Sequence, residues 1–168
     1  MGVAGSWNYL CKKIYDEGND YALIVNDDVY LGYGTKEVLS VIKEDKIGIV
    51  QSYHNWCVFL INKDLYKRIG EFDELFYPAY YEDSDYIYRL NLKGLRQGLD
   101  IRLNPELIRT SQTYEKNPEL VNRSMAENKE KYIRKWGGLP LLERYMLPFD
   151  GNREILEFLG YEQNIKIQ

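Results

Sequence analysis

The chain has 168 residues, of which 45% are hydrophobic and 29% are charged, a composition typical of a folded globular domain. Its 22 Lys and Arg residues are outnumbered by 26 Asp and Glu residues, and the net charge of −4 gives no positive surplus for binding nucleic acid. The longest apolar run covers residues 56–61, far short of the roughly 20 residues that cross a membrane. We therefore expect a single domain over residues 1–168, without a membrane span, in the cytoplasm.

The spacing of apolar residues predicts helices that alternate with strands in the first half of the chain. Apolar residues recur on one helical face over 6–17, and Gly18 can end that helix in the left-handed conformation. Asn62 is expected to cap a short helix that ends at Gly70. The expected elements are a helix at 6–17, a strand at 21–25, a helix at about 36–44, strands at 47–51 and 56–61, and a helix at 63–69.

The second half of the chain is expected to be mainly helical. Residues 71–83 are aromatic and acidic, and we expect a loop there, followed by a helix at 84–93 and a strand near 99–103. Pro118 suits the first turn of a long helix to about residue 134. A last helix is expected at 153–159, so residues from about 118 to 168 form a helical C-terminal part. The residues expected to face inward from the long helix are Val121, Met125, Tyr132 and Trp136.

This alternation favours an α/β fold, with a parallel or mixed sheet and helices on both of its faces. Residues 21–25 are apolar throughout, which is typical of a strand that is covered on both faces in a parallel sheet. In such sheets, ligands lie beyond the carboxyl ends of the strands. The residues that follow this strand are therefore the first candidates for a functional site.

Those residues are Asn26, Asp27 and Asp28. Two carboxylates and an amide at a strand end offer hard oxygen ligands, which suit Mg²⁺ or Mn²⁺ bound together with a diphosphate. The alternative is a plain turn, because Asn and Asp tolerate turn geometry and can bond to the local backbone. The spacing alone leaves both interpretations open.

A second acidic cluster, Glu82-Asp83-Ser84-Asp85, falls at the start of a predicted helix. Carboxylates there can cap free amides and are favoured by the helix dipole, so capping is one interpretation. Capping needs only one acid, however, and the preceding Tyr80 and Tyr81 could line a pocket as well as a core. A carboxylate at this place could then accept a proton from a substrate hydroxyl.

Tyrosine is unusually frequent, with 16 residues, and its rings and hydroxyls suit sugar-binding and protein-binding surfaces as well as ordinary packing. Cys11 and Cys57 have no nearby Cys or His, so we expect buried thiols and no disulfide or metal knuckle. The only histidine, His54, lies between two expected strands. We expect it in a loop or hydrogen-bonding role in preference to metal ligation.

Five short motifs follow one another along residues 2–138. They are Gly-x-Ala-x-x-x-Asn at 2–8, Asn26-Asp27-Asp28, Gly-x-Phe-Asp-Glu at 70–74, Glu-Asp-x-Asp at 82–85 and Lys-Trp-Gly at 135–137. In this order they resemble the motifs of the family 2 inverting glycosyltransferases, which have the GT-A fold. The resemblance implies a partial GT-A-like mixed sheet and the transfer of a hexosyl group from a nucleotide-diphosphate sugar to a hydroxyl acceptor such as a glycan.

On the donor side, the resemblance implies that Asp28, with Asn26 beside it, binds the Mg²⁺ or Mn²⁺ that neutralises the diphosphate. Asp27 and Arg109 would contact the donor, Arg109 standing in the loop where many family members have a metal-binding histidine. A plain surface role for Arg109 is the alternative.

On the acceptor side, the resemblance implies that Asp83 is the general base for in-line attack on the anomeric carbon. Glu82, Asp85, Tyr80 and Tyr81 would shape the site for the acceptor.

The family also has a nucleotide-binding portion ahead of the segment where this sequence begins. From this we expect a fragment of a longer or split enzyme, self-association, or a partner chain that supplies the other half, because bare sheet edges are rarely left unpaired. The alternative function is a non-catalytic module that binds glycans or proteins. An acidic protein that binds divalent ions in another way is a weaker alternative, because the spacing fits no EF-hand loop.

Overall fold

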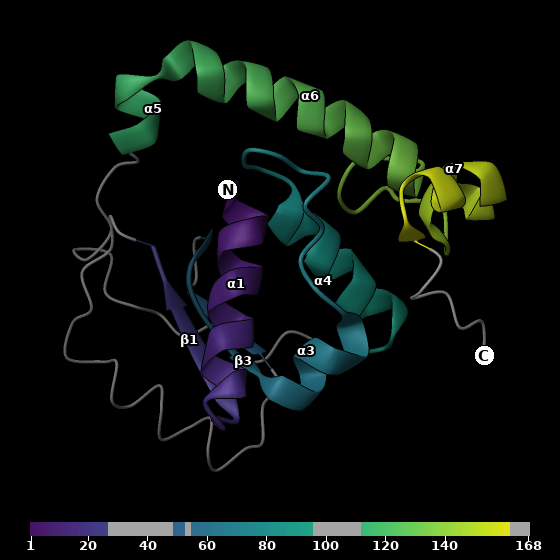
Figure 1. The fold of residues 1–168 in the computed structure, drawn as a ribbon. Coiled ribbons are helices and arrows are strands. Elements are labelled where there is room, and N and C mark those ends of the chain that lie inside the picture. The colour runs from purple at the N-terminus through teal and green to yellow at the C-terminus, as the bar shows by residue number, and fades with distance from the viewer. Residues whose placement is uncertain (27–48, 53–54, 96–111, 162–168) are drawn as a thin grey trace.

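The computed structural model of the chain describes residues 1–26, 49–52, 55–95 and 112–161. These residues form a mixed structure of helices around a small sheet (Figure 1). The elements are α1 (Val3–Asp16), β1 (Tyr21–Val25), β2 (Ile49–Ser52), β3 (Asn55–Asn62), α3 (Lys63–Ile69), α4 (Glu82–Leu92), α5 (Gln112–Lys116), α6 (Pro118–Trp136), the 3₁₀ helix η2 (Pro148–Gly151) and α7 (Arg153–Phe158).

The described strands form a three-stranded sheet in the order β1-β3-β2, and both pairs are antiparallel. In this register Ala22 lies opposite Ile61. The parallel pairing expected for the strand at 21–25 is therefore absent from the described part of the sheet. Burial also alternates along β1: Ala22 and Ile24 are buried, while Leu23 is only half-buried. The expectation was of a strand equally covered on both faces, and the alternation shows that the face of Ala22 and Ile24 is covered more completely than the other.

The core lies between α1, the sheet and α4, and aromatic rings dominate it. The ring of Trp7 on α1 lies 5.0 Å from that of Phe59 on β3 and 5.1 Å from that of Phe72, centre to centre. Phe72 stacks at 4.2 Å on Tyr86 of α4. Figure 1 shows α1 lying across β1 and β3, with α4 beside it. Since buried aromatic pairs add to the stabilisation that comes from apolar burial, these rings join the three parts into one body.

Local signals placed several helix ends where the sequence predicts them. The side chain of Asn62 accepts hydrogen bonds from the amides of Asp64 (2.9 Å) and Leu65 (3.3 Å), which caps α3. Gly70 follows α3 with φ +92°, and Gly137 follows α6 with φ +75°. Glycine adopts these left-handed conformations without steric cost. The predicted helix at 63–69 is thus confirmed.

Other boundaries differ from the prediction. Helix α4 begins at residue 82 and not at 84, and the short helix α5 was not expected. The expected helix at 36–44 and strand near 99–103 lie outside the described residues.

Cys11 is a buried free thiol, as expected, and burial raises its pKa to about 12.

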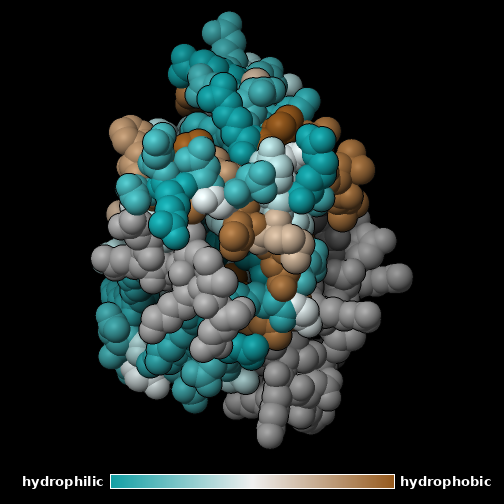
Figure 2. All heavy atoms as spheres, turned by 90° about the vertical axis from the view of Figure 1, so that its right-hand side faces the viewer, coloured by the Kyte–Doolittle hydropathy of each residue, from teal (hydrophilic) through white to brown (hydrophobic). Residues whose placement is uncertain are grey.

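Figure 2 views the molecule from the right-hand side of Figure 1, where α7 lies, and shows apolar groups scattered among polar ones on this face. The most exposed large apolar side chains of the C-terminal part are Leu141, Leu142, Met146 and Phe158. Within the described ranges, no helix combines the length and the apolar character that a membrane span requires.

Candidate active site

The chain makes a strained corner just before α4. Tyr80 and Tyr81 both have left-handed backbones, with φ +77° and +74°. This conformation costs an L-residue about 1–2 kcal/mol. Two buried side chains of α6 hold the corner: the hydroxyl of Ser124 donates to the carbonyl of Ala79 (2.9 Å), and the amide of Asn128 donates to the same carbonyl (2.7 Å) and to that of Tyr80 (3.2 Å).

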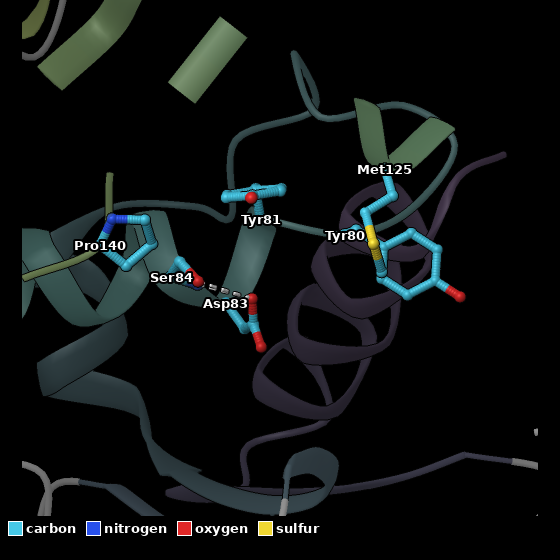
Figure 3. Close-up of a pocket in the computed structure, with 6 residues that line it drawn as sticks. All are labelled: Tyr80, Tyr81, Asp83, Ser84, Met125 and Pro140. Carbon is cyan, nitrogen blue, oxygen red and sulfur yellow. Dashed lines mark hydrogen bonds between the residues drawn. The ribbon is translucent and has the colours of Figure 1, made fainter. Parts of the chain in front are cut away.

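A pocket of about 280 Å³ opens at this corner. Figure 3 shows Asp83 and Ser84 between Pro140 on one side and Tyr80 with Met125 on the other, and the ring of Tyr81 near the middle of the group. The residues that line the pocket are Tyr80, Tyr81, Asp83, Ser84, Met125 and Pro140. The walls are thus mostly aromatic or apolar, and one carboxylate faces the space.

Asp83 lies in the first turn of α4 and is half-buried. Its Oδ1 accepts hydrogen bonds from the amide (2.6 Å) and the hydroxyl (3.3 Å) of Ser84. Burial raises the pKa of Asp83, and the bonds from Ser84 only partly offset that rise. None of the ion pairs between described residues includes Asp83. Its carboxylate is therefore open to the pocket and more basic than an ordinary aspartate.

Glu82 is buried, and its Oε2 has no hydrogen-bond partner among the described residues. Burial, together with the charge of Asp83, raises the pKa of Glu82 to about 8. Glu82 does not line the pocket. This residue is thus next in sequence to Asp83 but turned into the protein and away from the pocket.

Asp85 has a different environment from the acceptor site that was expected for it. Its side chain is fully buried, and its Oδ1 accepts hydrogen bonds from Lys135 Nζ (2.5 Å) and Trp136 Nε1 (2.8 Å). Its Oδ2 accepts a hydrogen bond from Arg89 Nε (2.8 Å). A carboxylate with three partners and no exposed surface is not accessible to an acceptor, so the structure gives Asp85 the role of an anchor for α4.

Lys135 forms ion pairs with two acids, Asp85 and Asp73. Its Nζ lies 2.5 Å from Oδ2 of Asp73 as well as from Asp85, and its side chain is only 1% exposed. Asp73 also accepts hydrogen bonds from the hydroxyl of Tyr161 and the amide of Leu75. Burial works to raise the pKa of Asp73, but the charge of Lys135 and these hydrogen bonds outweigh it, so the pKa is lowered. We call Asp73, Asp85, Arg89 and Lys135 the buried ion cluster.

A further buried contact attaches α1 to the same region. Asn8 donates from Nδ2 to the carbonyl of Phe72 (2.8 Å) and to Glu74 (3.1 Å), and its Oδ1 accepts from the amide of Phe72 (2.8 Å) and the hydroxyl of Tyr66 (3.1 Å). All the hydrogen-bonding capacity of this amide is used inside the protein. Asn8 therefore fixes the loop that precedes the corner.

Four of the five sequence motifs meet in this way. Asn8 of the first motif binds Phe72 and Glu74 of the third, while Asp73 of the third and Asp85 of the fourth both bind Lys135 of the fifth. The motif residues with these contacts are structural supports for α4. Asp83, by contrast, lines the pocket.

The donor-side residues are described only in part. Asn26 directly follows β1 and is half-buried, whereas Asp27, Asp28, Arg109 and His54 lie outside the described residues. Among the residues that are described, no group of three or more His, Cys, Asp or Glu side chains gathers closely enough to hold a metal ion. The expected Mg²⁺ or Mn²⁺ site therefore remains a prediction.

Sequence reasoning missed Ser124, Asn128 and Pro140, and it placed Met125 in the core. Met125 is 44% exposed and lines the pocket. Asn128 could have been noticed, because an asparagine on the inward face of a helix needs buried partners. Pro140 gives no such signal, since its place depends on the turn after α6.

The comparisons with known proteins do not extend this picture. Searches against family models, curated proteins and solved structures found no match to this chain.

Proposed function

We propose that this chain is the catalytic part of an inverting, metal-assisted glycosyltransferase in which Asp83 is the general base. The observation that carries the proposal is the environment of Asp83: a half-buried carboxylate with a raised pKa, free of ion pairs with described residues, on a pocket with two tyrosines. Acids that are desolvated in a pocket without a compensating base are typical of functional sites. We propose the GT-A-like fold of the chain together with this function.

The chemistry asks for a base on one side of the sugar and a leaving group on the other. Asp83 would accept the proton of the acceptor hydroxyl while that oxygen bonds to the anomeric carbon and the bond to the diphosphate breaks with inversion. A raised pKa favours this step, because a base transfers protons best when its pKa approaches the working pH. Tyr80 and Tyr81 would pack against the acceptor, and rings of this kind suit the flat faces of sugars.

The donor side of the proposal rests on the sequence motif. Asp28 and Asn26 would hold Mg²⁺ or Mn²⁺, and Asp27 and Arg109 would contact the nucleotide-diphosphate sugar. The bound cation would supply charge neutralisation at the departing diphosphate.

The test is a panel of nucleotide-diphosphate sugars, each with and without Mn²⁺, added to the purified chain. A donor at 100 times its Kd should raise the free energy of unfolding by about 2.7 kcal/mol, and only with the metal. Donors that stabilise the chain are then incubated with a glycan array, and new glycosidic products are sought by mass spectrometry. Stabilisation and product formation would support the proposal.

Failure to bind or turn over any donor would favour a second function. If no donor binds or turns over, while immobilised glycans bind saturably and lose affinity when Tyr80 and Tyr81 are replaced by alanine, the protein is a non-catalytic binding module. The pocket with its paired tyrosines is the feature that favours this second function.

A further inference from the structure

Helix α6 forms hydrogen bonds with residues on both sides of Asp83 in the sequence: with the corner before α4 and with Asp85 in its first turn. Asn128 and Ser124, in the middle of α6, bind the carbonyls of Ala79 and Tyr80. Lys135 and Trp136, in its last turn, bind Asp85. The residue proposed as the base therefore stands between two attachments to the same helix.

The first attachment controls a conformation that the chain would not adopt unaided. Two consecutive tyrosines with left-handed backbones are strained, and such strain persists only where surrounding groups impose it. The carbonyl of Tyr81 in turn accepts the hydrogen bond from the amide of Asp85 (2.9 Å), a bond that closes the first turn of α4. The direction in which the side chain of Asp83 projects from α4 thus depends on how residues 79–81 are held.

Asn128 is itself oriented by its neighbours. Its Oδ1 accepts a hydrogen bond from Lys131 Nζ (2.9 Å), which also donates to the carbonyl of Leu75 (2.9 Å). This leaves the Nδ2 group, the donor end of the amide, for the two carbonyls of the corner. Asn128 is fully buried, so both contacts are shielded from bulk solvent. The position requires a donor and an acceptor on one short side chain, which an aspartate of the same size does not supply when ionised.

We propose that Asn128, assisted by Ser124, is a positioning residue: it holds Tyr80 and Tyr81 in their left-handed conformation and so sets the place of the Asp83 carboxylate in the pocket. This inference rests on the proposed function for its effect on catalysis. Its effect on the corner is independent of that function.

The test compares Asn128→Asp with Asn122→Asp, a matched change at an exposed asparagine of the same helix. In Asn128→Asp a carboxylate oxygen replaces the donor and faces two carbonyl oxygens. We expect the NMR amide signals of residues 80–84 to shift in this variant and to stay in place in the control. If a donor has been found, kcat should fall about tenfold to hundredfold while the KM for the donor is unchanged, because misplacement of a reacting group by about 1 Å costs rate on that scale.

The outcomes separate the inference from the proposed function. Unchanged signals at residues 80–84 in a folded Asn128→Asp protein would overturn the inference, and so would shifted signals with an unchanged kcat. If the wild-type chain turns over no donor, the proposed function fails, and the NMR comparison alone decides whether Asn128 holds the corner. Should Asn128→Asp fail to fold, Ser124→Ala removes one donor from the Ala79 carbonyl and should shift the same signals by a smaller amount.

Discussion

The start of α4 brings together two kinds of acidic residue within four positions. Asp85 is fully buried and is bound by Arg89, Lys135 and Trp136. Asp83 faces a pocket, Glu82 is buried with an oxygen that has no hydrogen-bond partner in the described part of the chain, and burial raises the pKa of both. Asp85 therefore differs from Asp83 and Glu82 in that basic side chains among the described residues compensate its buried charge.

That difference separates stability from function. A buried carboxylate with basic partners is a structural element whose loss leaves the partners uncompensated. A carboxylate without such partners carries a desolvation cost that the fold does not recover, and sites of that kind are frequent where proteins bind or react. Variants at the two kinds of site should therefore differ in their effects on stability and on its dependence on pH.

The largest effect is expected from Lys135→Met, which keeps an unbranched side chain but leaves Asp73 and Asp85 buried without their shared cation. We expect the free energy of unfolding to fall by about 3–5 kcal/mol, measured by urea denaturation. The matched control is Lys12→Met, because Lys12 also forms a close ion pair, 2.8 Å from Glu71, but is 54% exposed. An exposed pair contributes about 0–1 kcal/mol. Equal losses in the two variants would show that the buried ion cluster is no more stabilising than a surface pair.

The next effect concerns Glu82, through the dependence of stability on pH. Between its ordinary pKa of 4.5 and the raised pKa of about 8, the folded protein retains a proton that the unfolded chain releases. Stability contributed by the protonated form is therefore lost as pH rises through this window, by at most about 1.4 kcal/mol per pH unit. Glu82→Gln removes the loss, so urea unfolding at several pH values should show the variant gaining on the wild type towards about pH 8.

The control for this prediction is Glu130→Gln, at an exposed position of α6. Its stability curve should run parallel to that of the wild type. Asp73 gives the opposite sign: its pKa is lowered, so its contribution is present above its ordinary pKa and is lost as pH falls. A Glu82→Gln curve parallel to the wild type would mean that Glu82 ionises normally in the fold.

A smaller loss is expected from Gly138→Ala, in the turn that carries Pro140 to the pocket. A Cβ at this position would lie 1.9 Å from the carbonyl oxygen of Leu142, so the turn must open. We expect the free energy of unfolding to fall by about 1–3 kcal/mol. In Gly160→Ala nothing lies within 4 Å of the new methyl, and only the strain of a left-handed backbone is expected, about 1–2 kcal/mol. Thermal unfolding of both variants checks the difference.

The sequence predicted the elements that local signals control. Asn62, Gly70 and Pro118 mark helix ends by capping and backbone geometry, and the structure has helix ends at these residues. The antiparallel pairing of β1 was not predictable from the apolar run at 21–25, because such a run does not reveal the direction of its neighbour. Strand direction is set by the partner strand β3, whose paired residues lie 33–41 positions further along the chain.

The same limit applies to the candidate site. The sequence identified Asp83 and its neighbouring tyrosines, and the structure places them together at a pocket. It did not separate Asp83 from Asp85, because their difference arises from Lys135 and Trp136, which are 50 and 51 residues from Asp85. Asn128 was overlooked for a related reason: its partners are backbone carbonyls, which no sequence pattern displays.

We propose that Asp83 acts in chemistry whereas Asp85 acts in stability, and one paired measurement distinguishes these two roles. Asp83→Asn and Asp85→Asn are compared for unfolding free energy and for turnover of the donor that stabilises the wild type. We predict that Asp83→Asn folds normally and loses turnover by about 10²–10⁴-fold, and that Asp85→Asn loses about 3–5 kcal/mol of stability. An Asp83→Asn protein with full turnover would show that Asp83 is not the general base.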